Sequence, residues 1–199
     1  MKTQWPKPHD FHPPFIGTCT KGRALPLAWR VRHSPKGHCP EALHIAVVKL
    51  MSQLIPEGAK VVFLGDGEFD GTALQSTLHE LGWSYVCRTA MSTTATWNGQ
   101  TFRLDTLGAC LKPGRLIELK NVYFTRDAYG PIMVLCCWAK GYHEPLYLVS
   151  TMATAEEACR LYQKRFRIET FFSDQKSRGF HITGCEFQIP QNARRLINV

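Results

Sequence analysis

The sequence predicts an α/β fold, in which strands and helices alternate and pack in layers. Three observations lead to this prediction. Short apolar runs alternate with amphipathic segments over residues 24–89, β-like runs separated by turn residues fill 90–150, and a capped helix begins near Thr154. The chain has 199 residues, of which 44% are hydrophobic and 20% charged. This composition is typical of a folded domain of ordinary size.

The region before residue 90 contains three strand-like runs with two helices between them. The strand-like runs are residues 24–31, 60–64 and 83–89. The helices are expected at 41–54 and at 71–81. The apolar face of the first helix is expected to comprise Leu43, Ala46, Val47, Leu50 and Leu54. This βαβαβ order favours parallel pairing of the strands.

Residues 90–150 have a different texture, with four β-like runs between turns rich in Gly, Pro and Asp. The runs are residues 96–104, 114–125, 131–140 and 144–150. We interpret this region as a β-rich insertion or extension and not as a separate domain. Thr154 and Glu157 then form a capping box, T-x-x-E, and the helix that they begin is expected to fade near Lys176, before Gly179.

Asp66 is the first candidate functional residue, because it follows an apolar strand inside a Gly-Asp-Gly turn. Strand ends in open α/β sheets border crevices, and flanking glycines let a ligand approach the backbone. A carboxylate there can bind a hard metal ion or act as a general base. The alternative is a turn aspartate that caps the next helix, for which Asp70 is equally suitable.

Four polar side chains of the late helix form a second candidate site. Tyr162, Arg165, Glu169 and Lys176 are spaced so that, at about 100° per residue, they lie along nearly one stripe of the helix. The carboxylate can hold a divalent metal ion, while the phenol, guanidinium and ammonium groups engage phosphates. The alternative is a solvated helix face, stabilised by an i,i+4 ion pair between Arg165 and Glu169.

The same residues match a family signature. The spacing Y-x2-R-x3-E-x6-K is the YREK signature, and the chain resembles the bacterial insertion-sequence DDE transposases of the IS-four type that carry it. KGRALPLAWRV and VVFLGDGEFDG are similar to the segments that lead to the second catalytic aspartate of these enzymes. GFHITGCEFQ is similar to the segment that comes after the signature, so the resemblance covers about residues 15–190.

The resemblance implies a ribonuclease H-like fold, in which a mixed sheet is flanked by helices. A β-rich insertion is expected between the second catalytic Asp and the catalytic Glu. The core is expected to comprise about residues 15–90 and 151–190, and the insertion about residues 91–150. Together they make a partial catalytic domain over 1–199.

The resemblance also implies roles for the candidate residues. Asp66 and Glu169 are expected to be the second and third catalytic acids and to bind Mg²⁺ or Mn²⁺. In such enzymes one ion activates water or a DNA 3′-hydroxyl, and the other stabilises the leaving oxygen. Tyr162, Arg165 and Lys176 are expected to contact the phosphates of double-stranded DNA at the transposon ends.

The charge and composition suit a DNA partner. Lys and Arg number 24 against 16 Asp and Glu, so the net charge is +8. This favours nucleic acid first and an anionic membrane surface second, although a basic protein without such a partner has the same charge. No apolar run reaches the roughly 20 residues of a membrane span, and no export signal is visible. We expect a cytoplasmic protein that joins the nucleoid on binding DNA.

The cysteines predict neither a disulfide framework nor a zinc site. The chain has 8 cysteines and no C-x-x-C pair, which indicates buried free thiols in a reducing compartment. His33, His38 and Cys39 are close in sequence but match no zinc-binding spacing.

The chain departs from the family pattern at the first acid. The family places this aspartate in a stretch like D-x-T-x-W, where the chain has Met1, Thr3 and Trp5. Asp10 is the one nearby substitute, and it lies among prolines. Two carboxylates do not reproduce a site that three normally build. We therefore expect a truncated transposase remnant, cut at the first acid and before a final apolar helix, that has lost most of its chemistry.

Two other functions stay open at this point. The chain can be a non-catalytic DNA-binding or interaction protein that associates with itself or interferes with a full-length transposase. It can also be a ribonuclease H-like nuclease that acts on structured nucleic acid. The YREK stripe argues against this nuclease, which needs no clamp for a specific DNA end.

Overall fold

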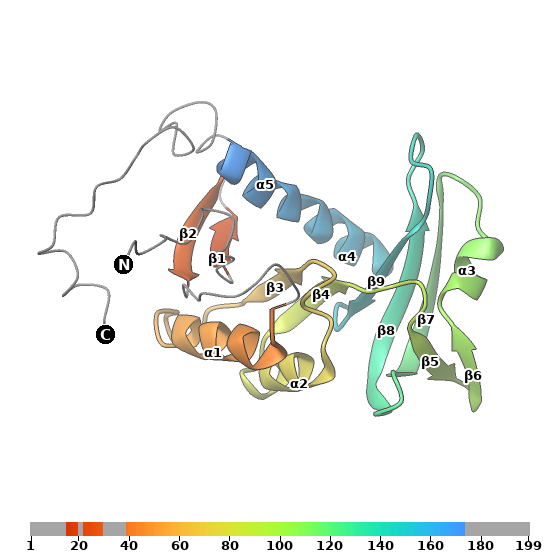
Figure 1. Ribbon diagram of the computed structural model, residues 1–199, viewed down its shortest axis with the longest axis horizontal. Helices are drawn as coiled ribbons and strands as arrows, with labels where there is room; N and C mark the ends of the chain where they lie inside the picture. The colour runs from red at the N-terminus through yellow and green to blue at the C-terminus, as the bar shows by residue number, and fades with distance from the viewer. Residues whose placement is uncertain (1–14, 20–21, 30–38, 174–199) are drawn as a thin grey trace, which may run out of the picture.

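The computed structural model describes residues 15–19, 22–29 and 39–173 (Figure 1). Its elements are, in chain order, β1 (Phe15–Cys19), β2 (Ala24–Trp29), α1 (Glu41–Ser52), β3 (Val62–Gly65), α2 (Thr72–Glu80), β4 (Ser84–Arg88), β5 (Thr94–Trp97), β6 (Gln100–Arg103), α3 (Asp105–Ala109), β7 (Arg115–Phe124), β8 (Tyr129–Trp138), β9 (Leu146–Ser150), α4 (Ala155–Tyr162), the 3₁₀ turn η2 (Gln163–Arg165) and α5 (Phe166–Ser173).

Seven strands form one mixed sheet in the order β3-β4-β9-β8-β7-β5-β6. β3 and β4 pair in parallel, and the other pairings described in this sheet are antiparallel. Helices lie on both faces of the β3–β4 end, with α1 and α2 below it and α4 and α5 above it in Figure 1. The predicted fold class, a mixed sheet flanked by helices, is confirmed.

The first predicted strand does not join the seven-stranded sheet. β2 pairs antiparallel with β1 in a separate two-stranded sheet. The prediction of parallel pairing is therefore correct for β3 and β4 but wrong for β2. The connection between β1 and β2 is short, so closing this hairpin costs little chain entropy. Pairing β2 with β3 would instead have to span the whole of α1.

The central strands are covered on both faces, and their side chains alternate between two cores. Tyr85 and Cys87 of β4 belong to the core on the side of α1 and α2. Val86 between them packs on the opposite side, with Ala155 and Ala158 of α4. This alternation is the two-residue period of a strand, and burial on both faces explains why these strands are near-continuous apolar runs in the sequence.

Helix α1 packs with a face that matches the predicted one only in part, because Val47 is buried as predicted but Leu50 and Leu54 are not. Its buried residues are His44, Val47, Val48 and Met51. Leu50 and Leu54, expected on the apolar face, are exposed. The helix contacts α2 as well as the β1–β2 hairpin. These two neighbours therefore decide which stripe is buried, and the apolar spacing alone does not.

The β5–β6 hairpin lies at the far edge of the sheet. Asn98 and Gly99 form its two-residue turn with positive φ angles of 49° and 76°, as Asn-Gly turns of this kind require. The long strands β7 and β8 connect this edge to β9 and β4. The short helix α3, which the sequence did not predict, packs beside β6 and β8.

The late helix is not continuous, although its start is as predicted. The Thr154 hydroxyl accepts a hydrogen bond of 3.3 Å from the Glu157 amide. After Tyr162, however, the turn η2 interrupts the α-helix. A 3₁₀ turn has about three residues per turn, so the helix is irregular here, although Arg165 still lies beside both Tyr162 and Glu169. Within η2 the Cys19 thiol of β1 donates to the Lys164 carbonyl, 3.4 Å away, which ties the turn to the hairpin.

The predicted burial of the thiols is correct for only some of the described cysteines, since Cys19, Cys39, Cys137 and Cys159 are half-buried. Cys87 and Cys136 are buried, whereas Cys110 is exposed. Cys110 is the C-cap of α3 and follows its last turn.

The described ranges contain no helix that is both long and apolar enough to cross a membrane. Several predictions concern residues outside these ranges. They are the predictions for Asp10, His33, His38, Lys176 and Gly179.

Candidate functional site

Asp66 lies directly after β3, at the carboxyl end of the parallel strand pair. Its carboxylate Oδ1 accepts a hydrogen bond of 3.1 Å from the Glu68 amide, and its carbonyl accepts one of 3.0 Å from the Phe69 amide. These bonds close a tight turn that fixes the carboxylate. The turn needs glycine at position 65, because a Cβ there would lie 2.6 Å from the Phe69 Cβ.

Neither aspartate of this loop caps α2, so the alternative interpretation of Asp66 as a helix cap is wrong. The first turn of α2 is capped from another helix, because Oε1 of Glu41 accepts a hydrogen bond of 2.8 Å from the Leu74 amide. Asp70 accepts instead from the Thr89 hydroxyl at the end of β4, over 2.7 Å. The Asp66 carboxylate is therefore not used to hold the helix.

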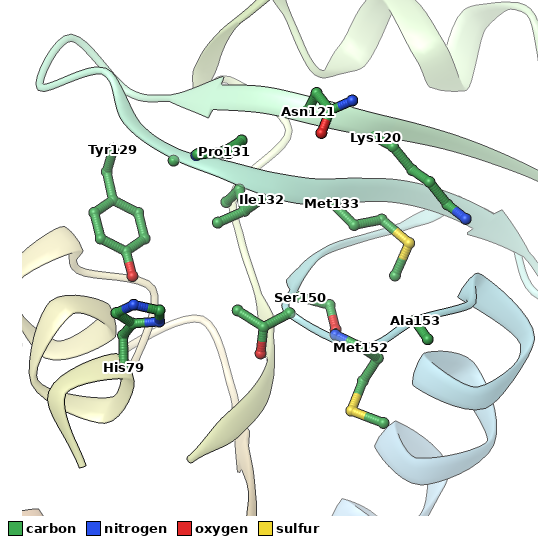
Figure 2. A pocket seen from close by; sticks show the side chains of 12 residues that line it. His79, Lys120, Asn121, Tyr129, Pro131, Ile132, Met133, Ser150, Met152 and Ala153 are labelled. Atoms are coloured by element: carbon green, nitrogen blue, oxygen red, sulfur yellow. The ribbon is translucent and has the colours of Figure 1, made fainter. Parts of the chain in front are cut away.

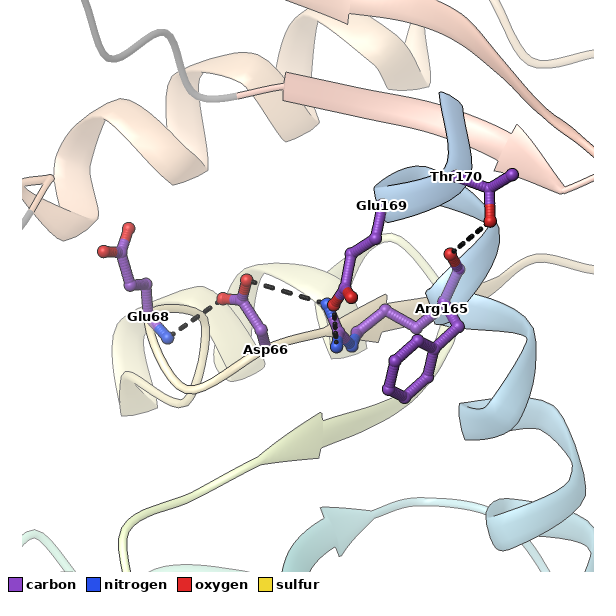
Figure 3. Close-up of polar contacts among 6 residues, drawn as sticks. Asp66, Glu68, Arg165, Glu169 and Thr170 are labelled. Carbon is purple, nitrogen blue, oxygen red and sulfur yellow. Dashed lines mark hydrogen bonds and ion pairs between the residues drawn. The ribbon is translucent and has the colours of Figure 1, made fainter. Parts of the chain in front are cut away.

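Arg165 connects the two acids that the sequence singles out (Figure 3). Its Nη2 lies 2.6 Å from Oε1 of Glu169, and its Nη1 lies 4.0 Å from Oδ2 of Asp66. The predicted i,i+4 pair between Arg165 and Glu169 is present. The contact with Asp66, from a distant part of the chain, brings all three side chains into one cluster, as Figure 3 shows.

The guanidinium of Arg165 is the most enclosed part of this cluster. Its side chain is 15% exposed, compared with 47% for Asp66 and 52% for Glu169. It lies 5.6 Å from the ring centroid of Tyr162 and 5.4 Å from that of Phe166, within the range of cation–π contacts. Burial acts to lower the pKa of Arg165, but the hydrogen bond to Glu169 and the nearby negative charges raise it overall.

Tyr162 borders the cluster from the end of α4. It is 5% exposed, and burial raises the pKa of its hydroxyl, while the positive charges of Arg165 and Arg88 and a hydrogen-bond interaction with Arg165 act in the opposite direction. The hydroxyl oxygen of Tyr162 and Nε of Arg165 are buried with no hydrogen-bond partner among the described residues. Buried polar groups usually have a partner. The two groups lie beside each other and interact, but without well-formed hydrogen-bond geometry, so each keeps capacity for a better-placed partner.

The acids have the right donor atoms for a divalent ion, but their arrangement does not fit one. Carboxylate oxygens are the ligands that Mg²⁺ prefers. The guanidinium of Arg165 already bonds Glu169 and faces Asp66. In the part of the chain that the structure describes, no three His, Cys, Asp or Glu side chains are grouped to hold a metal ion. In this arrangement the two carboxylates bind the guanidinium of Arg165 and not a metal ion.

A cavity of about 480 Å³ lies away from this cluster (Figure 2). It is bordered by β7, β8, the end of α2 and the connection from β9 to α4, and its lining includes His79, Lys120, Tyr129, Met133 and Met152. β9 runs antiparallel to β4, so its last residue, Ser150, lies toward the amino end of β4. The cavity therefore lies toward the amino ends of the parallel strands, whereas Asp66 lies at their carboxyl ends.

The sequence analysis singled out Asp66, Tyr162, Arg165 and Glu169, and the resemblance implied that the two acids share one site, but it did not predict that Arg165 lies between them. The contact between Asp66 and Arg165 had no signal in the sequence, because residues so far apart show no spacing pattern. Lys176, the remaining member of the predicted stripe, lies outside the described residues.

The sequence is similar to a known protein family over most of its length. Residues 25–197 match the family model described as the transposase DDE domain. A search of curated proteins found no match.

Proposed function

The chain belongs to the transposase DDE domain family, and from this premise we propose that it is an insertion-sequence transposase of the YREK group. The family acts on DNA and typically uses divalent metal ions. We assign Asp66 and Glu169 as two of its catalytic acids. The observation that carries this assignment is that one arginine, Arg165, contacts both carboxylates.

The DNA-binding side of the proposal rests on charge and on unused hydrogen-bond donors. Arg165 and Tyr162 each bury a donor without a partner among the described residues. A phosphate can accept from both a guanidinium and a phenol. The net charge of +8 favours a polyanion. We propose that Tyr162, Arg165 and Lys176 contact the phosphates at a transposon end, with the core at about residues 15–90 and 151–190 and the insertion at 91–150.

We further propose that this chain, alone, binds DNA but does not cleave it. In-line attack on a phosphodiester by water or a 3′-hydroxyl needs the attacking and leaving oxygens both to be stabilised. Two carboxylates that are paired with one arginine do not stabilise either of these oxygens. Asp66 and Glu169 remain our proposed ligands for Mg²⁺ or Mn²⁺, and that role requires the guanidinium of Arg165 to leave the space between them.

Binding and nicking assays on the purified chain test this proposal. We expect the affinity for a labelled DNA duplex, measured by fluorescence anisotropy, to fall with salt, and Arg165→Gln to weaken binding more than Arg126→Gln. Arg126 is the matched control, because it is an exposed arginine in the β7–β8 turn. Supercoiled plasmid with Mg²⁺ or Mn²⁺ is expected to stay intact. Nicking that disappears in Asp66→Ala would show instead that the chain is an active enzyme.

A second candidate function arises from the same cluster. With an arginine between its acids, the chain can bind DNA or a subunit without chemistry and interfere with a full-length transposase. Added to a transposition assay of such an enzyme, it is expected to lower the yield of products. An unchanged yield at saturating chain would exclude this second function and leave DNA binding unaffected.

A further inference from the structure

The position of Arg165 has a consequence for DNA binding. Its guanidinium is hydrogen-bonded to Glu169 and faces Asp66, yet the same side chain is proposed to bind a DNA phosphate. One guanidinium edge cannot serve both partners. We propose that Asp66 and Glu169 form a latch that holds Arg165 back from DNA, so that phosphate binding must first break these contacts. This inference rests on the proposed function, because it takes DNA as the competing ligand.

The latch consists of one strong contact of Arg165, with Glu169, and one weak contact, with Asp66. The 2.6 Å bond between Nη2 and Glu169 is a charge-assisted hydrogen bond. The 4.0 Å separation from Asp66 is an ion pair at the limit of direct contact. Both carboxylates are about half exposed, so water weakens their attraction for the guanidinium. The latch is therefore strong enough to occupy Arg165 and weak enough to open.

Opening of the latch is favoured because the latched arginine leaves one of its hydrogen-bond donors, Nε, without a partner within the described ranges. Nε of Arg165 is buried without a partner among the described residues, and an unsatisfied buried donor costs free energy. A phosphate offers several oxygens and can accept from Nε and one Nη together, in the bidentate geometry that suits arginine. The cation–π contacts of Arg165 with the rings of Tyr162 and Phe166 do not require one fixed orientation of the guanidinium. They can accompany the guanidinium as it turns toward a phosphate.

Competition for one side chain makes the acids antagonists of DNA binding. Because the free energy of breaking the latch is subtracted from the free energy of binding, neutralising either acid increases the affinity. Glu169 has the larger effect, since it makes the shorter contact. The effect of either acid disappears when Arg165 is absent, whereas a general change of charge acts with or without this arginine.

DNA affinity of matched variants tests the latch. For a duplex of about 20 base pairs at fixed salt, we expect Glu169→Gln to tighten binding about threefold to tenfold and Asp66→Asn about twofold. Glu68→Gln is the control, because its exposed side chain points away from Arg165 in Figure 3 and removes the same charge from the same turn. If Glu68→Gln tightens binding as much as Glu169→Gln, the gain is general and the latch is refuted.

The double variant separates the latch from simple charge. In the Arg165→Gln background, Glu169→Gln is expected to give no more than the gain of Glu68→Gln. A full gain without the arginine would overturn the proposal. Glu169→Gln keeps the size of the side chain, whereas Arg165→Gln shortens it, and circular dichroism on each variant checks that the fold is retained.

A measurement without DNA distinguishes failure of the latch from failure of the proposed function. Phenylglyoxal modifies accessible arginines, and peptide mass spectrometry reports the rate at Arg165. We expect this rate to rise severalfold in Glu169→Gln and not in Glu68→Gln. An unchanged rate refutes the latch, whatever the DNA result. A raised rate in a protein that binds no DNA would refute the proposed function, and with it the release of Arg165 to phosphate.

Discussion

Two buried tyrosines lie on opposite faces of the same sheet and differ in the hydrogen bonding of their hydroxyl groups. Tyr85 of β4 is 0% exposed, and its hydroxyl donates to Oε1 of Gln75 over 3.1 Å. The Gln75 amide in turn donates to the Asp70 carbonyl over 2.9 Å. Tyr162 of α4 is 5% exposed, but its hydroxyl has no partner among the described residues.

The difference separates a part of the molecule that is built for stability from one that keeps hydrogen-bond capacity for a ligand. Around Tyr85, the hydroxyl and the Gln75 amide are both hydrogen-bonded, which joins α2 to the sheet and to the loop before α2. Around Tyr162, the neighbouring donor on Arg165 is also unsatisfied within the described ranges, and that arginine is shared between two carboxylates. If this contrast is correct, substitutions on the Tyr85 side lower stability, whereas those on the Tyr162 side act mainly on binding.

The largest effect is expected at Gly65, which joins the two regions. In Gly65→Ala the new Cβ would lie 2.6 Å from the Phe69 Cβ and 2.9 Å from the Cys87 Sγ. We expect the free energy of unfolding, measured with urea, to fall by about 2–3 kcal/mol. Gly67→Ala is the matched control, since its Cβ would meet nothing within 4 Å. Equal losses in the two variants would show that the crowding at Gly65 is not what matters.

The next largest effect on stability is expected from Tyr85→Phe. It removes the donor to Gln75 and leaves a buried amide oxygen without that partner. The expected loss is about 1–2 kcal/mol of unfolding free energy. A loss below that of Tyr162→Phe would contradict the contrast between the two regions, because it would mean that the Gln75 bond contributes nothing.

A smaller effect is expected from pH on the Tyr85 side of the sheet. Burial raises the pKa of the Cys136 thiol from 9.0 to about 11, against an opposing effect of its hydrogen bond with Tyr147. The unfolded chain ionises this thiol near its ordinary value, so its contribution to stability is complete below pH 9 and is lost as pH rises toward 11. We expect this thiol alone to account for about 1 kcal/mol of loss between pH 8 and pH 10.

Two variants isolate this thiol. In Cys136→Ala the fall in unfolding free energy between pH 8 and pH 10 is expected to be smaller than in the unmodified chain. Cys110→Ala removes an exposed thiol and serves as the comparison. An identical pH profile for Cys136→Ala and the unmodified chain would exclude Cys136 as the source.

The sequence predicted the elements whose patterns are local. The helix expected at 71–81 is α2, Thr72–Glu80, and the strand expected at 83–89 is β4, Ser84–Arg88. Apolar spacing and a closing glycine suffice for such segments. The fold class followed from their order, and the capping role of Thr154 followed from the residue type.

The features that the sequence did not predict depend on distant neighbours. The buried face of α1 is decided by α2 and the β1–β2 hairpin, so Leu50 was placed wrongly. The turn η2 contains neither Pro nor Gly and is tied to Cys19. The candidate residues were identified by type and spacing. Their meeting around Arg165 required the return of the chain from β9 to the β3 edge, and no local pattern encodes that.

Tyr162→Phe is expected to have the smallest effect on stability, within about 0.5 kcal/mol, because removing a hydroxyl without a partner also removes its unmet desolvation cost. Its effect on DNA affinity is expected to be larger, a loss of about twofold to fivefold, since a phosphate oxygen is the acceptor that this hydroxyl lacks. Urea unfolding and anisotropy on the same preparation measure the two effects. A loss of stability like that of Tyr85→Phe, with unchanged DNA affinity, would make Tyr162 a structural residue and remove the contrast. Unchanged stability with weaker binding would place its hydroxyl on the DNA.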